Sequence, residues 1–277
     1  MFRLTWYFFV GCCSVVFTMT SLGSAWADDS TSNPWKFTVA PYVWAFGMNG
    51  DVGVAGRTIR VDDSFIDIMQ DSDSLVAFMG NFLVNKGPWT FYVAPTWAKV
   101  GTDDESIGPL NFDVTETIAF VGFGLMYRLM DRSLADVPGG SPEWANQRIT
   151  FDLLAGGRYT NLNIETEFKG PLPTVDQTQE WVDPIIGGVT NMTLTDKLSV
   201  RVRADVGGFG VGTDFTGHTV VLIGYKVHPF GLDGTFLAGY RALYQDYSDG
   251  SGLRKFTWDM WLHGPVVGLA IDFTPFN

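Results

Sequence analysis

The chain has 277 residues, with 18 Lys and Arg against 30 Asp and Glu and a formal net charge of −12. An excess of acidic side chains argues against nucleic acids and anionic lipid surfaces as partners, because both are polyanions. The two cysteines are adjacent near the N-terminus, and no apolar run after that region reaches the roughly 20 residues that a membrane-spanning helix needs.

The first residues have the pattern of an export signal. Arg3 precedes an apolar run over residues 4–16, and small and polar residues lead to Ala25-Trp26-Ala27, an A-x-A cleavage pattern. An uncleaved anchor is the weaker interpretation because the run is too short to span a bilayer. The sequence predicts a signal peptide over 1–27 and one mature domain over 28–277. Cys12 and Cys13 fall inside the signal, so the mature chain has no disulfide to stabilise it.

Aromatic residues and glycines are abundant in the remaining chain. The sequence is 15% aromatic and contains 32 glycines. The aromatic residues recur at strand spacing and lie near segment ends, as the two aromatic girdles of a membrane β-barrel require. The first such segment begins at Trp35 and places Phe37, Val39, Pro41 and Val43 on one face.

Ten segments alternate between apolar and small or polar residues, as strands with one face on lipid and the other on a lumen do. They are residues 35–46, 75–84, 88–100, 112–130, 148–161, 180–194, 198–211, 215–227, 234–244 and 256–273.

The connections between these segments differ in length and composition. Residues 47–74 are rich in Gly and Asp and predict a long extracellular loop, in which 52–61 could form a hairpin. Residues 85–87 form a tight turn, residues 101–109 an acidic loop, and residues 131–146 an irregular stretch containing Pro and Gly. Pro41 and Pro95 predict a bulge or a position near the rim, because proline removes a ladder hydrogen bond.

These observations predict an all-β fold, a closed antiparallel up-and-down transmembrane β-barrel. The count is about ten strands, and twelve if the 52–61 hairpin joins the wall. An even number returns both ends of the chain to the periplasmic side. Closure is required because an open sheet would leave unpaired backbone groups facing lipid.

Several short phrases occur together in a characteristic order. They are Pro41-Tyr42-Val43-Trp44, the loop with Gly50, Gly56-Arg57 and Ser64, Gly157-Arg158-Tyr159, Trp181-Val182-Asp183-Pro184 with Gly187, the glycine-rich stretch 205–210, Gly239-Tyr240-Arg241, and His263-Gly264-Pro265 before Gly268-Leu269. In this set the chain resembles a family of uncharacterised proteobacterial outer-membrane β-barrel proteins, across nearly the whole mature chain. The resemblance implies a location and a fold but no activity. The chain departs from the pattern at its C-terminus, Pro275-Phe276-Asn277.

The alternation places a set of charged residues on the lumen face. The candidates are Asp152, Arg158, Asp183, Arg201, Arg203, Asp205 and Arg241, with Asp272 in the last strand. Charges inside a narrow barrel are costly unless they are paired or hydrated. They therefore predict either a structural network of ion pairs that fills the interior or a narrow polar pore that selects solutes. Barrels of about ten strands are close to the size that side chains fill, so a wide channel is not expected.

Three other patterns give weaker indications of a functional site. The glycines at 207–212 do not precede a helix, so they predict no nucleotide site. His218, His228 and His263 lack the spacing of metal ligands, and an enzyme at the rim would need His263 to meet Asp259 or Ser199. The acidic residues in 62–73 and 103–105 predict solvated loops or sites for divalent cations that bridge lipopolysaccharide.

The sequence thus predicts a porin-like protein of the cell outer membrane of a Gram-negative bacterium, monomeric, without cofactor or metal, and not an enzyme. Its expected role is structural or the passage of small solutes through a narrow pore. The alternatives are a plugged barrel that binds a ligand or a surface and, with less support, an enzyme at the rim. Expected partners are outer-membrane lipid, lipopolysaccharide and the barrel-assembly machinery.

Overall fold

The computed structural model of the protein describes residues 34–54, 57–107, 110–169 and 174–273. The predicted signal peptide, its cleavage point and the C-terminal Pro275-Phe276-Asn277 lie outside these residues.

The described residues form mainly β-strands. The strands are β1 Lys36–Trp44, β2 Gly47–Val54, β3 Arg57–Asp63, β4 Ser74–Lys86, β5 Trp89–Ile107, β6 Leu110–Ser133, β7 Arg148–Phe168, β8 Val175–Thr193, β9 Leu198–Gly208, β10 Phe215–Val227, β11 Gly234–Asp249 and β12 Phe256–Phe273. The helices are α1 Phe65–Asp71 and the short 3-10 turns η1 Leu134–Asp136, η2 Pro142–Trp144, η3 Pro229–Gly231 and η4 Gly252–Arg254.

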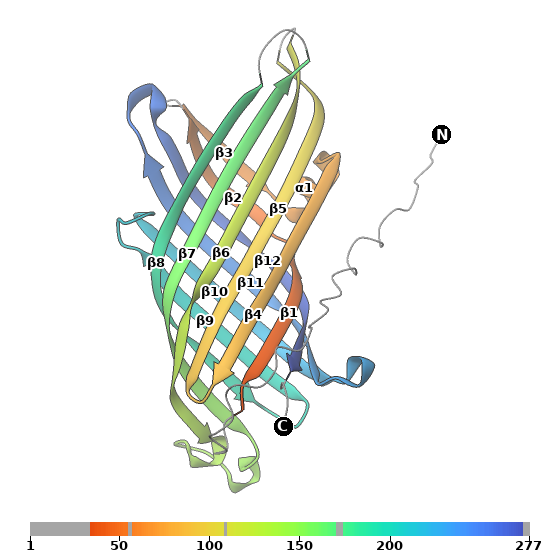
Figure 1. Cartoon of the computed structure of the whole chain (residues 1–277), viewed down its shortest axis with the longest axis vertical. Helices are drawn as coiled ribbons and strands as arrows, with labels where there is room; N and C mark the ends of the chain where they lie inside the picture. The colour runs from red at the N-terminus through yellow and green to blue at the C-terminus, as the bar shows by residue number, and fades with distance from the viewer. Residues whose placement is uncertain (1–33, 55–56, 108–109, 170–173, 274–277) are drawn as a thin grey trace, which may run out of the picture. The chain divides into compact units, whose positions relative to one another are not determined.

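Ten of the strands close into an antiparallel ring. The order is β1-β4-β5-β6-β7-β8-β9-β10-β11-β12, and β12 returns to β1 through pairs such as Phe37↔Phe273 (Figure 1). The predicted closed ten-stranded barrel is confirmed. The hairpin predicted within 52–61 also forms, as β2 and β3, but it pairs with one edge of β12 and lies outside the ring.

The two ends of the barrel differ. The near end, where the described chain begins and finishes, holds Phe37 and Phe273. At the far end two groups of strands extend beyond the shorter β9 and β10. The first arm is the continuation of β5, β6, β7 and β8, and the second arm comprises the ends of β11 and β12 with β2 and β3. Pairing of β8 with β9 starts at Ile185↔Gly207, so residues 175–184 of β8 belong to the first arm alone.

The first arm corrects two predicted loops. The acidic stretch 101–109 was predicted as a loop, yet β5 continues to Ile107 and β6 begins at Leu110. Likewise β7 continues to Phe168 and β8 begins at Val175, where the sequence predicted a loop after residue 161. These parts of the strands extend beyond the closed ring, and polar residues occur in them without the strict alternation seen within the ring.

The prediction for the two prolines was wrong for Pro95, because the register shifts lie between Thr102 and Glu105 and between Arg128 and Met130. Pro41 forms the last pair of the β1–β4 ladder, Pro41↔Gly80, so it lies where the ring ends between these two strands, as predicted. Pro95 falls where the ladder between β4 and β5 is interrupted, between the pairs Met79↔Thr96 and Phe82↔Val93. A missing donor costs little where the ladder already has a gap.

Helix α1 connects the second arm to β4. Ser64 caps it, and its hydroxyl and backbone N–H both donate to the Asp67 carboxylate, so the pKa of Asp67 is lowered. None of the described helices combines the length and the hydropathy that crossing a membrane would require.

Candidate functional site

Asp205 is the centre of a buried polar network inside the barrel. Its carboxylate accepts hydrogen bonds from Arg158 at 2.5 Å and from Nε of Arg203 at 2.8 Å, and it lies 3.0 Å from Nδ1 of His218. All four side chains are buried, between 3% and 8% exposed. One carboxylate thus balances two guanidinium groups, and charge-assisted bonds of this kind are the strong ones in a dry interior.

The network extends across the lumen to the opposite wall. Nε of Arg241 donates to Nε2 of His218 at 3.1 Å, so His218 carries its proton on Nδ1 and donates it to Asp205. Nη1 of Arg241, from β11, also donates to Tyr42 of β1 at 2.8 Å and to Thr96 of β5 at 3.2 Å. The contact with Thr96 joins walls that lie four strands apart in the closed ring.

A second contact crosses the lumen beside the first. Arg203 of β9 donates to the hydroxyl of Tyr92 on β5 at 3.1 Å, and its guanidinium lies 4.7 Å from the centre of the same ring. We call Arg158, Arg203, Asp205, His218 and Arg241 the arginine layer.

Strand register sets the geometry of this layer. Asp205 and His218 face each other across the β9–β10 hairpin, and Val220 lies between Arg203 and Arg241 on neighbouring strands. The hairpin connection contains Phe209 with a φ of 51°, flanked by glycines with positive φ. Asp183 holds this connection in place, because it accepts from the backbone N–H and hydroxyl of Thr213 at 2.7 and 2.8 Å.

The predicted lumen charges divide into three groups. Arg158, Arg203, Asp205 and Arg241 meet in the arginine layer. Asp152 is buried but pairs with Arg128 at 2.8 Å, nearer the near end, and Arg201 donates to Asn191 at 3.2 Å. Asp183 is buried as a loop anchor, and Asp272 lies at the exposed near end, where Thr38 donates to it.

The sequence did not indicate that Tyr42, Tyr92, Thr96 and Arg128 belong to the interior networks. Arg128 follows the same alternation as the predicted charges, and this signal could have found it. Tyr42, Tyr92 and Thr96 could not be assigned from the sequence, because their partners lie on strands that are not their neighbours in the sheet.

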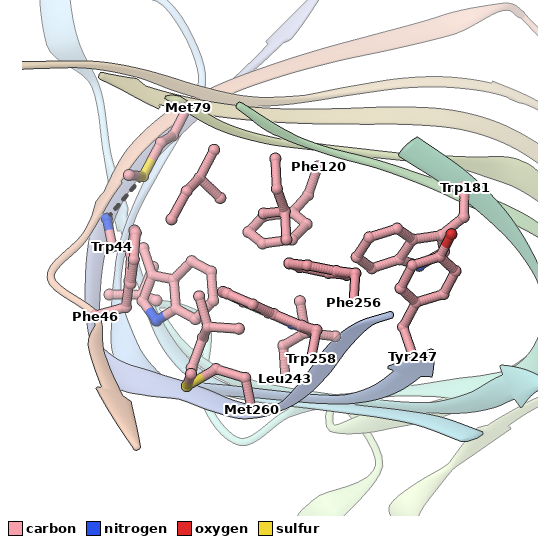
Figure 2. Close-up of a cluster of buried hydrophobic side chains, with 14 residues drawn as sticks. Trp44, Phe46, Met79, Phe120, Trp181, Leu243, Tyr247, Phe256, Trp258 and Met260 are labelled. Atoms are coloured by element: carbon pink, nitrogen blue, oxygen red, sulfur yellow. Dashed lines mark hydrogen bonds between the residues drawn. The ribbon is translucent and has the colours of Figure 1, made fainter. Parts of the chain in front are cut away.

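An apolar cluster lies in the lumen on the far side of the arginine layer. Figure 2 shows its side chains pointing toward one another between the strands. Trp181 of β8 stacks on Tyr247 of β11 with ring centres 4.0 Å apart. Trp44 of β1 lies under the Arg241 guanidinium at 4.1 Å. Met260 of β12 is fully buried. We call this group the far cluster, and its members are Trp44, Phe46, Met79, Ile118, Phe120, Leu162, Trp181, Leu243, Tyr247, Phe256, Trp258, Met260, Leu262 and Val266.

A cleft of about 310 Å³ lies outward of the far cluster, between the two arms. Its apolar wall comes from both arms and its floor from the far cluster, and the lining includes Met48, Val52, Ile59, Val61, Ile118, Leu162, Ile164, Phe256, Trp258 and Met260. Its polar lining residues are Asp63, Glu116, Thr117, Asn163, Gln177 and Gln179. The pKa of Glu116, above the closed ring, is raised first by burial and then by the charge of Asp63.

His263 does not meet Asp259 or Ser199, the partners that the sequence named for an enzyme at the rim. Nδ1 of His263 lies 2.6 Å from the hydroxyl of Tyr240 on the outer face of the barrel, while Asp259 accepts from Tyr244 at 2.9 Å. Ser199 contacts the carbonyl of Gly224 at 3.5 Å. Within the described residues, no three His, Cys, Asp or Glu side chains are grouped as a metal ion would require.

Comparisons with known proteins identify no relative from which a function can be taken. No family model matches the sequence, and no curated protein matches it.

Solved structures match the chain only at low similarity. The attachment invasion locus protein Ail of Yersinia pestis, in complex with the heparin analogue sucrose octasulfate, is 8% identical with a TM-score of 0.35, over 87% of this chain and 100% of that chain. The translocator domain of the autotransporter NalP from Neisseria meningitidis is 12% identical with a TM-score of 0.36, over 86% and 88%. A FadL homologue of Pseudomonas aeruginosa is 9% identical with a TM-score of 0.26, over 88% and 90%. Similarities this low carry no argument about what this chain does.

Proposed function

We propose that the protein is an outer-membrane barrel with a closed lumen that binds an apolar or amphipathic ligand in the cleft at its outer mouth. In this orientation the near end faces the periplasm and the far end faces outward. The observation that carries the proposal is the apolar cleft, which opens outward and has the closed far cluster as its floor.

The outer face of the ring supports placement in a membrane. It exposes a continuous set of large apolar side chains, which a water-soluble protein of this size would bury. They include Phe91, Leu125, Leu153, Ile186, Val221, Ile223 and Val267. Exposed aromatic residues lie on either side of this band, Trp89, Tyr127, Tyr225 and Phe236 near one end and Phe215, Tyr240 and Trp261 near the other. The family resemblance in the sequence agrees with this placement and remains a prediction.

The closed interior favours binding over passage. The predicted narrow pore needs a hydrated path past the arginine layer and the far cluster. Instead Met260, Leu262 and Leu243 are fully buried, and hydrogen bonds from Arg203 to Tyr92 and from Arg241 to Thr96 cross the lumen. A lumen filled in this way agrees with the size of a ten-stranded ring.

The lining of the cleft defines the chemistry of its ligand. An apolar body would displace water from Ile59, Ile164 and Trp258, and each CH₂ buried contributes about 0.8 kcal/mol. The amides of Gln177 and Gln179 could bind a polar end of the ligand at the rim. The proposed role is therefore binding, without catalysis, cofactor or metal.

An environment-sensitive apolar dye, N-phenyl-1-naphthylamine, tests the cleft. We expect saturable binding to the folded protein in detergent, with energy transfer from Trp258 at the floor. The double variant Ile59→Ser, Ile164→Ser should bind about tenfold more weakly, because it removes apolar contact from both walls. Ile59 and Ile164 are 64% and 36% exposed, so the substitutions leave the barrel core intact.

Ile66→Ser is the matched control, because Ile66 is 63% exposed on α1 and lies outside the cleft lining. It should bind the dye as the unmodified protein does. Dye binding that is not saturable, or that responds equally to all three substitutions, would show that the cleft is not a ligand site.

A further inference from the structure

A separate cavity of about 100 Å³ lies inside the barrel, on the near side of the far cluster. Its lining includes Arg158, Arg201, Arg203, Arg241 and His218 together with Ala40 and Leu237 toward the near end. A single water needs roughly 10–15 Å³ by this measure of volume, so the cavity has room for several waters or a small polar molecule.

The walls of this cavity carry more positive than negative charge. Four guanidinium groups line it, and the carboxylate in contact with them is Asp205, which already accepts from Arg158 and Arg203. In the part of the chain that the structure describes, no carboxylate lies within 4.0 Å of Arg201 or Arg241. Positive charge away from water is unfavourable without a counter-charge, so the excess of guanidinium groups on these walls favours a bound anion.

The wall of the cavity also carries a buried polar atom without a hydrogen-bond partner. The buried side-chain oxygen of Asn81 has no hydrogen bond within the described residues. The amide group can turn by half a revolution and present its NH₂ donors at the same place. Arg201 is only partly buried, and its Nη1 donates to Asn191 at 3.2 Å. The other N–H groups of its guanidinium are therefore available to a ligand.

We propose that this cavity is a binding site for a small oxyanion, a free carboxylate or phosphate that enters from the near end. The planar guanidinium groups of Arg201 and Arg241 match two oxygens of such a group, and Asn81 adds a neutral donor. The volume is too small for a lipid headgroup together with its chains. The site is independent of the cleft, which lies beyond the far cluster.

Thermal unfolding in a nonionic maltoside detergent tests the site, with inorganic phosphate and acetate as probes. Chloride is replaced by either probe at constant ionic strength, and the folded fraction is read from heat-modifiable migration on gels. We expect a saturable rise in the unfolding midpoint, from which an apparent Kd follows. Arg201→Gln should weaken this Kd at least tenfold, because it removes charge-assisted hydrogen bonds.

Arg128→Gln is the matched control, since Arg128 is an interior arginine paired with Asp152 and does not line the cavity. Its phosphate Kd should stay within about twofold of the unmodified value. Arg241 also holds His218 and Tyr42, so Arg201→Gln is the deciding variant. A midpoint that does not change when phosphate or acetate replaces chloride, or an equal loss in both variants, would overturn the site.

Discussion

Asp205 has the strongest predicted effect on stability of any single residue. Replacing it with Ala leaves Arg158 and Arg203 without a counter-charge in a dry interior. Removing one partner of a buried ion pair costs about 3–5 kcal/mol. We expect Asp205→Ala to lower the free energy of unfolding by this amount, measured by urea titration of the refolded protein in detergent.

The exposed pair Arg60–Asp51 gives a comparison for that measurement. Its side chains are 62% and 42% exposed and lie 3.6 Å apart on the β2–β3 hairpin. Asp51→Asn should change stability by less than about 1 kcal/mol, because exposed ion pairs are hydrated and screened. Equal losses in the two variants would contradict the central role of Asp205.

Glu116 makes ligand binding in the cleft dependent on pH. Its raised pKa means that protonation is easier in the folded protein than in a free glutamate. An apolar ligand would remove further water from Glu116, which disfavours the charged form again. Dye binding should therefore tighten as the pH falls through this raised pKa and weaken as the pH rises above it.

Glu116→Gln removes the titrating group without changing its size. The variant should bind the dye at neutral pH as tightly as the unmodified protein does at low pH, with no remaining dependence in that range. If the pH dependence of dye binding is the same in the variant, another group causes it. Asp63, across the cleft, would then be the first residue to substitute.

At the scale of elements, the β2–β3 hairpin is dispensable for closure of the ring. β12 pairs with β1 over Val266–Phe273 and with the hairpin over Phe256–His263, so the two contacts are separate. Replacing residues 49–62 with a flexible Gly-Ser linker should leave a heat-modifiable barrel. The same variant should lose dye binding, because the hairpin supplies one wall of the cleft.

Replacing residues 135–146 with a Gly-Ser linker is the matched control, which tests whether any replacement of this length abolishes dye binding. That segment connects β6 and β7 and contributes nothing to the cleft lining. It should leave dye binding unchanged. Failure of the hairpin variant to form a barrel, with the control folded, would show that the ring needs the hairpin.

The sequence predicts elements well where side chains alternate between buried and exposed positions along a strand. β12 occupies the predicted range 256–273, because its side chains alternate in this way from Phe256 to Val267, in the second arm as well as in the ring. β5 and β7 were predicted too short, because the alternation of their residues weakens in the parts that extend beyond the ring. The same alternation selected Arg158, Arg203, Asp205 and Arg241, yet the contacts of Arg241 with Tyr42 and Thr96 depend on how the ring closes. Ring closure leaves no local signal in the sequence.

At the scale of the whole molecule, two successive layers fill the lumen, and we expect either one to block it. The arginine layer crosses it through hydrogen bonds from Arg203 to Tyr92 and from Arg241 to Thr96, and the far cluster fills it with Trp181, Tyr247 and Met260. In planar bilayers the refolded protein should therefore show no steady conductance. The double variant Arg203→Ala, Arg241→Ala should be equally silent, because the far cluster remains.

Conductance should appear only when large side chains are removed from both the arginine layer and the far cluster. Adding Trp181→Ala and Tyr247→Ala to the arginine double variant removes two stacked rings from the far cluster and should give measurable channels. The Trp181→Ala, Tyr247→Ala pair alone is the control, and the arginine layer should keep it silent. Steady channels in the unmodified protein would mean that the lumen opens in a bilayer and that the predicted pore is the better description. Dye binding would still report on the cleft, because the cleft lies outward of both layers.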